Sequence, residues 1–121
     1  MSELDPVLEP VHAYLEGHAT GDPSHFRRAF LPTARIEGVS AADGAAATMD
    51  LDDFCSRFAG APAPDEADRR RTVDQVARHG TVASATVTLH HVEVTFTDMF
   101  VLLEVDPGSW RIAHKVYHRH A

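Results

Sequence analysis

The sequence contains little cysteine and no excess of basic residues, and these two absences exclude several classes of protein. Cys55 is the single cysteine among 121 residues, so neither an internal disulfide nor a cysteine-based zinc cluster can form. The 11 Lys and Arg residues are outnumbered by 18 Asp and Glu residues, and the net charge is −7 with the histidines neutral. This sign argues against general affinity for nucleic acid or for an anionic membrane.

Long apolar runs are also missing. No stretch approaches the ~18 consecutive apolar residues that a membrane span requires. The first residues, Met-Ser-Glu-Leu-Asp, are acidic and lack the apolar run of a signal peptide. We therefore expect a cytoplasmic protein without a membrane partner. The length is that of one ordinary domain, so we predict a single domain over residues 1–121.

The first half of the chain has the periodicity of helices. Apolar residues recur at three- and four-residue steps from Leu4 to His18, which is the spacing of one buried helical face. Gly21 is predicted to end this helix, and Asp22-Pro23 to begin a second, short one. Asp50 is predicted to cap a third helix, whose apolar side comprises Leu51, Phe54, Cys55 and Phe58.

The second half has the pattern of strands. Residues 72–78, 81–92, 94–105 and 110–118 are predicted strands, and the last two flank the turn sequence Asp-Pro-Gly-Ser. A further short strand is expected at 34–37, followed by a loop or weak hairpin at 40–48. Helices first and long antiparallel strands later indicate an α+β domain with its helices on one face of a sheet.

Two stretches at opposite ends of the chain resemble one known superfamily. "YLEGHATGDPSHFRRAFLPTARIEGV" resembles the helix-turn-helix-strand opening of the nuclear transport factor 2-like superfamily, and "FTDMFVLLEVDPGSWRIAHKVYH" resembles its closing hairpin. Within the superfamily, the chain is most similar to the lumazine-binding branch, close to the SnoaL-like proteins. The resemblance implies a cone: a strongly curved, mostly antiparallel sheet wrapped round three N-terminal helices, with an internal pocket and a convex face that pairs two subunits.

The same resemblance draws attention to Tyr14. Ketosteroid isomerases of this superfamily carry a tyrosine at the corresponding place, where its hydroxyl stabilises an oxyanion. Their general-base aspartate falls near Gly38 and their acid partner near Val101, so this chain lacks both carboxylates. Tyr14 is therefore either an oxyanion donor of another kind or a core residue whose tip reaches the pocket.

Strand parity decides which residues of "WRIAHKVYHRH" face the pocket. Related sequences point the Lys/Arg of this pattern and the aromatic residue two positions later into the cone. Lys115 and Tyr117 are then pocket residues, while His114 and His118 lie on the outer face. Three histidines along one extended strand are too far apart to share a metal ion, so we expect no metal and no cofactor.

Other candidates for the site come from the remaining elements. Glu37 is the carboxylate expected near the mouth of the cone, either as a base with a raised pKa that partners Lys115 or as a surface charge. By the same parity argument, Asp98 is expected to face outward. Apolar residues that would line or fill the cavity are Phe54, Phe58, Met99 and Val101.

The leading hypothesis for function is a binding module for a small, partly polar, possibly aromatic ligand, held by Tyr14, Glu37, Lys115 and Tyr117. The alternative is a cofactor-independent cyclase, dehydratase or isomerase that uses Glu37 as base and Tyr14 or Lys115 at an oxyanion. A third hypothesis is an interaction protein with a filled cone. We also expect a homodimer, because parity would expose an apolar outer face formed by Trp110, Ile112, Phe96, Phe100 and Leu102.

Overall fold

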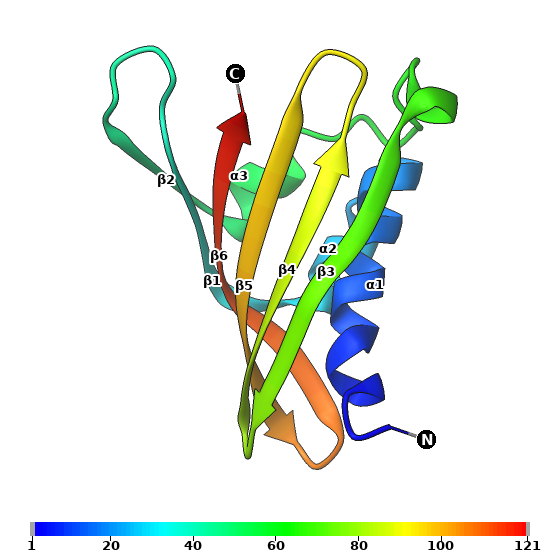
Figure 1. The fold of residues 1–121 in the computed structure, drawn as a ribbon, viewed down its shortest axis with the longest axis vertical. Coiled ribbons are helices and arrows are strands. Elements are labelled where there is room, and N and C mark those ends of the chain that lie inside the picture. The colour runs from blue at the N-terminus through cyan, green and yellow to red at the C-terminus, as the bar shows by residue number, and fades with distance from the viewer. Residues whose placement is uncertain (1, 121) are drawn as a thin grey trace.

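A computed structural model of the chain describes residues 2–120. Helices and strands follow the order predicted from the sequence, and the layers are visible in Figure 1. The elements are α1 (Asp5–Thr20), α2 (Ser24–Ala29), β1 (Phe30–Val39), β2 (Ala46–Asp50), α3 (Leu51–Cys55), the 3-10 turn η1 (Glu66–Asp68), β3 (Arg70–His79), β4 (Val82–His90), β5 (Thr95–Asp106) and β6 (Ser109–His120). The prediction of an α+β fold with helices on a sheet is confirmed.

All six strands form one mixed sheet in the order β2-β1-β6-β5-β4-β3. Neighbouring strands are antiparallel except β1 and β6, the second and third strands of the sheet, which run parallel. The sheet is not closed into a barrel, and α1, α2 and α3 lie behind it in Figure 1. Residues from the beginning and the end of the chain therefore lie side by side on β1 and β6.

The predicted end of α1 and the predicted start of α3 are confirmed, whereas α3 ends at Cys55 and does not extend to Phe58 as predicted. Gly21 ends α1 with a φ of 69°, a left-handed conformation that favours glycine, and its N–H donates to the Gly17 carbonyl at 2.9 Å. A Cβ at Gly21 would lie 2.0 Å from the carbonyl oxygen of Ala61, so no side chain fits there. Asp50 caps α3 by accepting a 2.8 Å hydrogen bond from the N–H of Asp53.

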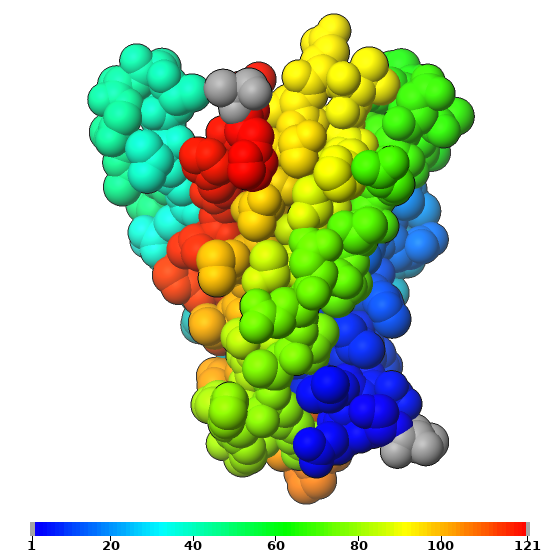
Figure 2. Space-filling view, in the orientation of Figure 1, coloured from blue at the N-terminus to red at the C-terminus, as the bar shows by residue number. Residues whose placement is uncertain are grey.

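A cluster of aromatic rings fills the space between the helices and the sheet. Tyr14 is fully buried at its centre, with ring centroids 4.8 Å from Phe100, 5.6 Å from Phe26 and 5.9 Å from Phe30. Such tilted and edge-on pairs are favourable beyond their buried area. No helix of residues 2–120 covers the opposite face of the sheet, which is turned toward the viewer in Figure 2.

A β-bulge in β6 overturns part of the predicted parity. Ile112 pairs with Leu102 while His114 pairs with Val101, so Ala113 is an extra residue that has no partner on β5. Before the bulge, Trp110 and Ile112 are buried, and after it Lys115 is buried. The prediction that Trp110 and Ile112 face outward is wrong, because one inserted residue reverses the alternation between them and Lys115.

The predicted orientation of β5 is also wrong. Phe100 and Leu102 are buried, whereas Met99 and Val101 are 54% and 51% exposed on the outer face. Both faces of this strand carry apolar residues, so alternation in the sequence does not distinguish them. Packing does: Phe100 lies against Tyr14 in the aromatic core. The outer face is apolar, as predicted, but with a different set of residues.

Candidate functional site

A cavity of about 210 Å³ lies between the end of α1, α3 and the inner face of the sheet. Its wall is mostly apolar and aromatic, and it carries a few polar groups that converge at its base. The lining residues are His18, Ile36, Met49, Phe54, Arg57, Leu89, His91, Phe96, Asp98, Lys115 and Tyr117. A concave, largely apolar site with few polar groups is the usual form of a small-molecule pocket.

Asp98 is the central polar group of this cavity. Its carboxylate is 1% exposed and accepts a short hydrogen bond from the Tyr14 hydroxyl through Oδ2. Because Tyr14 donates its only proton to Asp98, the 2.9 Å contact from His18 Nε2 to the same hydroxyl is a donation by the imidazole N–H. His18, Tyr14 and Asp98 therefore form a directed chain of hydrogen bonds from α1 to β5.

Lys115 supplies the positive charge beside this carboxylate. Its Nζ lies 3.7 Å from Asp98 Oδ2, and the two side chains are 6% and 1% exposed. The same Nζ lies 4.5 Å from the centroid of Phe54 and 5.0 Å from that of Tyr14, within the range of cation–π attraction. A buried ion pair thus forms the base of an apolar cavity.

Burial sets the protonation of the groups around this pair. It raises the pKa of Tyr14 well above its ordinary value, and the negative charge of Asp98 raises it further. The pKa of His18 is lowered well below its usual range by burial first and then by the charge of Lys115. Burial also lowers the pKa of Lys115, while Asp98 opposes that effect. At neutral pH the phenol and the imidazole are uncharged.

Tyr117 lies at one side of the cavity because a glycine leaves room for its ring. Gly38 pairs with Tyr117 across β1 and β6, and a Cβ at Gly38 would lie 2.5 Å from the Tyr117 ring. Phe96 approaches the same ring, with centroids 6.5 Å apart. Lys115 and Tyr117 both face the cavity, as the parity argument predicted for them.

Glu37 does not reach the cavity. It pairs with Val116 on the outer face of the sheet, and its Oε1 lies 2.7 Å from His114 Nε2, not near Lys115. The physical reason is the alternation of β1, in which the neighbouring Ile36 is the inward residue and lines the cavity. The predicted Glu37–Lys115 pair is therefore wrong, and His114 lies on the outer face as expected.

The other predicted residues fall into two groups. Phe54 lines the cavity, whereas Phe58 packs behind it at a centroid distance of 5.2 Å. Tyr14 lies beneath the base and contacts the lining residues His18 and Asp98 through its hydroxyl. Met99 and Val101, predicted as lining residues, are on the opposite face of the sheet.

The family model described as "Putative lumazine-binding" matches residues 2–118. The chain belongs to this family. No curated protein matches the chain. Among solved structures, a nuclear transport factor 2 (NTF2)-like protein of unknown function from Shewanella baltica OS155 is 28% identical, with a TM-score of 0.87 over 98% of this chain and 94% of that chain.

Two further NTF2-like proteins of unknown function have the same architecture as this lumazine-binding family member. The one from Methylobacillus flagellatus KT is 27% identical, with a TM-score of 0.82 over 100% of this chain and 96% of that chain. The one from Silicibacter pomeroyi DSS-3 is 24% identical, with a TM-score of 0.81 over 99% of this chain and 100% of that chain. The predicted membership of the NTF2-like superfamily is confirmed.

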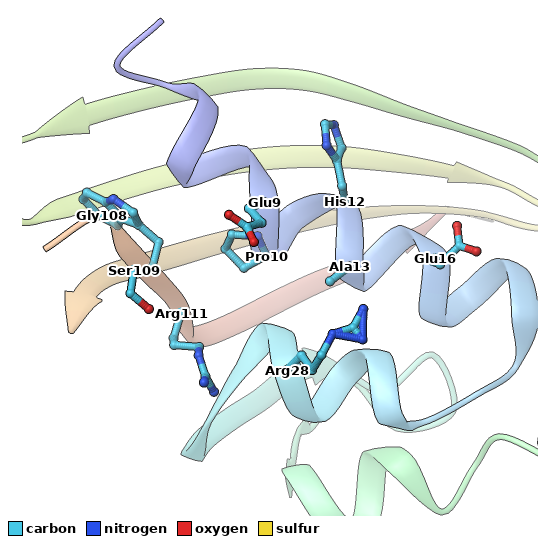
Figure 3. Close-up of a pocket in the computed structure, with 10 residues that line it drawn as sticks. Glu9, Pro10, His12, Ala13, Glu16, Arg28, Gly108, Ser109 and Arg111 are labelled. Atoms are coloured by element: carbon cyan, nitrogen blue, oxygen red, sulfur yellow. The ribbon is translucent and has the colours of Figure 1, made fainter. Parts of the chain in front are cut away.

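A larger groove of about 670 Å³ lies elsewhere on this NTF2-like domain, between α1, α2 and the turn that joins β5 to β6. Figure 3 shows Glu9 and Glu16 on α1, with Arg28 and Arg111 across the groove. Arg28 contacts His25, and Arg111 donates to the Phe30 carbonyl at 3.4 Å. These charged groups do not form a cluster, so the smaller cavity, with its buried ion pair, is the candidate site despite its size.

The predictions that Asp98 and Phe96 face outward are wrong, because both line the cavity. Residues 96–102 show apolar side chains at both parities, so only the position of Tyr14 opposite β5 identifies the inward face.

Within residues 2–120, no group of three or more His, Cys, Asp or Glu side chains is placed to hold a metal ion. In the same range, no helix is long and apolar enough to cross a membrane.

Proposed function

We propose that this chain binds a small, planar, partly polar ligand in the cavity above Asp98 and Lys115. The observation that carries the proposal is the buried ion pair at the base of a cavity whose walls are apolar and aromatic. Burying two charges is costly, and such pairs are seldom retained for stability alone. A role in orienting a polar ligand explains why they lie there.

The pair also limits the chemistry of the ligand. Lys115 donates and Asp98 accepts hydrogen bonds, and the two groups are 3.7 Å apart. They complement a ring that presents a carbonyl oxygen next to an N–H. Lumazine, a pteridine-dione, has such an edge, which agrees with the description of the family. A volume of about 210 Å³ favours one or two rings without a long substituent.

Lys115→Met is expected to weaken the affinity for lumazine by about 10- to 100-fold, because a hydrogen bond to a charged group contributes about 1.5–3 kcal/mol. Titration calorimetry with lumazine measures the change. His114→Ala is the control, since His114 belongs to the same strand but lies on the outer face. Equal affinity of wild type and Lys115→Met would remove the cavity as the binding site.

The enzymatic alternative requires a different general base from the one predicted from the sequence. A cyclase, dehydratase or isomerase in this cavity would use Asp98 in place of Glu37, because Glu37 is on the other side of the sheet. The specific observation in favour is the hydrogen bond from Tyr14 to Asp98, which places a phenol beside a carboxylate. Binding is the leading proposal, because Asp98, the one carboxylate among the described lining residues, already has two partners, Tyr14 and Lys115.

We also propose that two copies associate through the outer face of the sheet. Exposed apolar side chains gather there on the neighbouring strands β5 and β6. Met99 on β5 pairs with Val116 on β6, and Val101 lies two residues after Met99 on the same strand. Met99 is 54% exposed, Val116 41% and Val101 51%. An exposed apolar patch of this kind is typical of an interface between subunits.

Val101→Asp is expected to convert the homodimer to a monomer, because the new charge would be buried without a partner in the interface. Light scattering at micromolar concentration measures the mass. Val92→Asp is the matched control, since Val92 is 60% exposed in the turn between β4 and β5. A wild-type protein that is monomeric under these conditions would refute the dimer.

A further inference from the structure

Lys115 is the single lysine of the sequence, and the other ten basic residues are arginines. All other basic side chains except the histidines are thus guanidinium groups, and the one side-chain ammonium is buried at the cavity. The two side chains differ chemically, because a guanidinium stays protonated in proteins whereas a buried amine can lose its proton and act as a nucleophile. The position of the only side-chain amine therefore coincides with the candidate site.

The amine of Lys115 has an anionic partner on one side only. Its nearest anionic partner, Asp98 Oδ2, is 3.7 Å away, which is longer than an N–H···O hydrogen bond. Among residues 2–120, no other ion-pair partner contacts Nζ, and aromatic faces surround it. Lys115 lines the cavity, so its amine is within reach of a molecule bound there.

Burial shifts the amine toward its neutral form, while the charge of Asp98 opposes this shift. Burial lowers the pKa of Lys115, and desolvation in an apolar pocket is a common way to activate a lysine nucleophile. Asp98, at 3.7 Å, is placed to accept the proton that the ammonium loses. Tyr14 remains hydrogen-bonded to Asp98 and has a raised pKa, so it stays a phenol during this transfer.

We propose that Lys115 forms a Schiff base with a small aromatic aldehyde that enters the cavity. The inference rests on the proposed function, since it requires that the cavity bind small planar molecules. The ring of the aldehyde would lie among Phe54, Phe96 and Tyr117, with its carbonyl carbon at the amine. No cofactor, oxidant or reductant takes part in this step.

The step balances in atoms and charge. The ammonium gives one proton to Asp98, the nitrogen attacks the carbonyl carbon, and the carbonyl oxygen takes that proton back to give a carbinolamine. The C–N bond then becomes double as the C–O bond breaks, and the hydroxyl leaves as water with a second proton from nitrogen. Ammonium plus aldehyde thus gives a protonated imine plus water.

Reductive trapping tests the inference directly. The full-length protein is incubated with benzaldehyde and cyanoborohydride at pH 7.5, and intact mass and peptide mapping locate the benzyl group. With a single lysine, only Lys115 and the N-terminal amine can react. We expect the Lys115 peptide to be labelled faster in the folded protein than in urea. At pH 7.5 the neutral, reactive fraction of the amine rises about tenfold for each unit by which its pKa is lowered.

Lys115→Arg is the control variant, because it keeps the charge beside Asp98 and removes the amine. It is expected to retain its circular dichroism spectrum and to carry label at the N-terminus alone. Label at the N-terminus alone in the wild type, or equal rates at Lys115 in folded and unfolded protein, would overturn the inference.

Lumazine binding, measured on the same preparation, separates the two proposals. Binding without a Lys115 adduct refutes the Schiff base and leaves the binding function standing. The absence of both lumazine binding and the adduct refutes both proposals.

Discussion

Asp98→Asn is expected to destabilise the protein by about 3–5 kcal/mol, the usual effect of removing one partner from a buried ion pair. Asparagine has nearly the same shape, so the loss reports the charge and not the packing. Lys115, at 6% exposure, would be left as a buried ammonium without an anion, and Tyr14 would lose a carboxylate acceptor. Urea unfolding measures the change, and the melting temperature should fall by about 10 °C or more.

Two variants separate this effect from a general loss of charge. Asp52→Asn removes the partner of Arg27 in an exposed ion pair, in which the side chain of Asp52 is 81% exposed and that of Arg27 is 54% exposed. Such surface pairs contribute about 0–1 kcal/mol to stability. Lys115→Met in the Asp98→Asn background should restore part of the lost stability, because both charges are then gone. An Asp98→Asn protein as stable as Asp52→Asn would contradict the buried pair.

Acidification is expected to destabilise the protein through His18. Burial and the charge of Lys115 hold the pKa of His18 well below that of an unfolded histidine, so below about pH 6.5 the unfolded chain binds a proton that the folded chain excludes. Stability then falls by about 1.4 kcal/mol per pH unit until the folded pKa is reached. Between pH 6.5 and 5.5 this single group should remove about 1 kcal/mol.

His18→Phe should flatten this dependence, because it keeps an aromatic ring in the same cluster and cannot titrate. The measurement is urea unfolding of wild type and variant at pH 7.5, 6.5 and 5.5. His12→Gln is the matched control, since His12 belongs to the same helix but is exposed. The assignment of His18 fails if the two histidine variants show the same dependence on pH.

The fold could be predicted from the sequence because its signals are local. Gly21 ends α1, Asp50 caps α3, and the turn before β6 contains Pro107-Gly108, each at the expected place. Periodicity then distinguishes helices from strands, and the order of elements defines the class of fold.

The site could be predicted only in part because it depends on parity, which one inserted residue reverses. Lys115 and Tyr117 follow the bulge at Ala113 and face inward, whereas the residues before it were assigned to the wrong face. Asp98 was missed because β5 has apolar side chains on both faces and its partner Tyr14 is 84 residues away in the sequence. A contact between residues so far apart in the sequence cannot be recognised from local sequence patterns.

Methionine methyl resonances test the central claim, that ligands bind in the cavity at Asp98 and Lys115, most directly. Met49 lines this cavity, whereas Met99 is 54% exposed on the opposite face of the sheet. In protein labelled with ¹³C at the methionine methyl groups, titration with lumazine is expected to shift the Met49 signal and leave Met99 unchanged. A shift of Met99 with an unchanged Met49 would contradict the account and place the binding surface on the outer face.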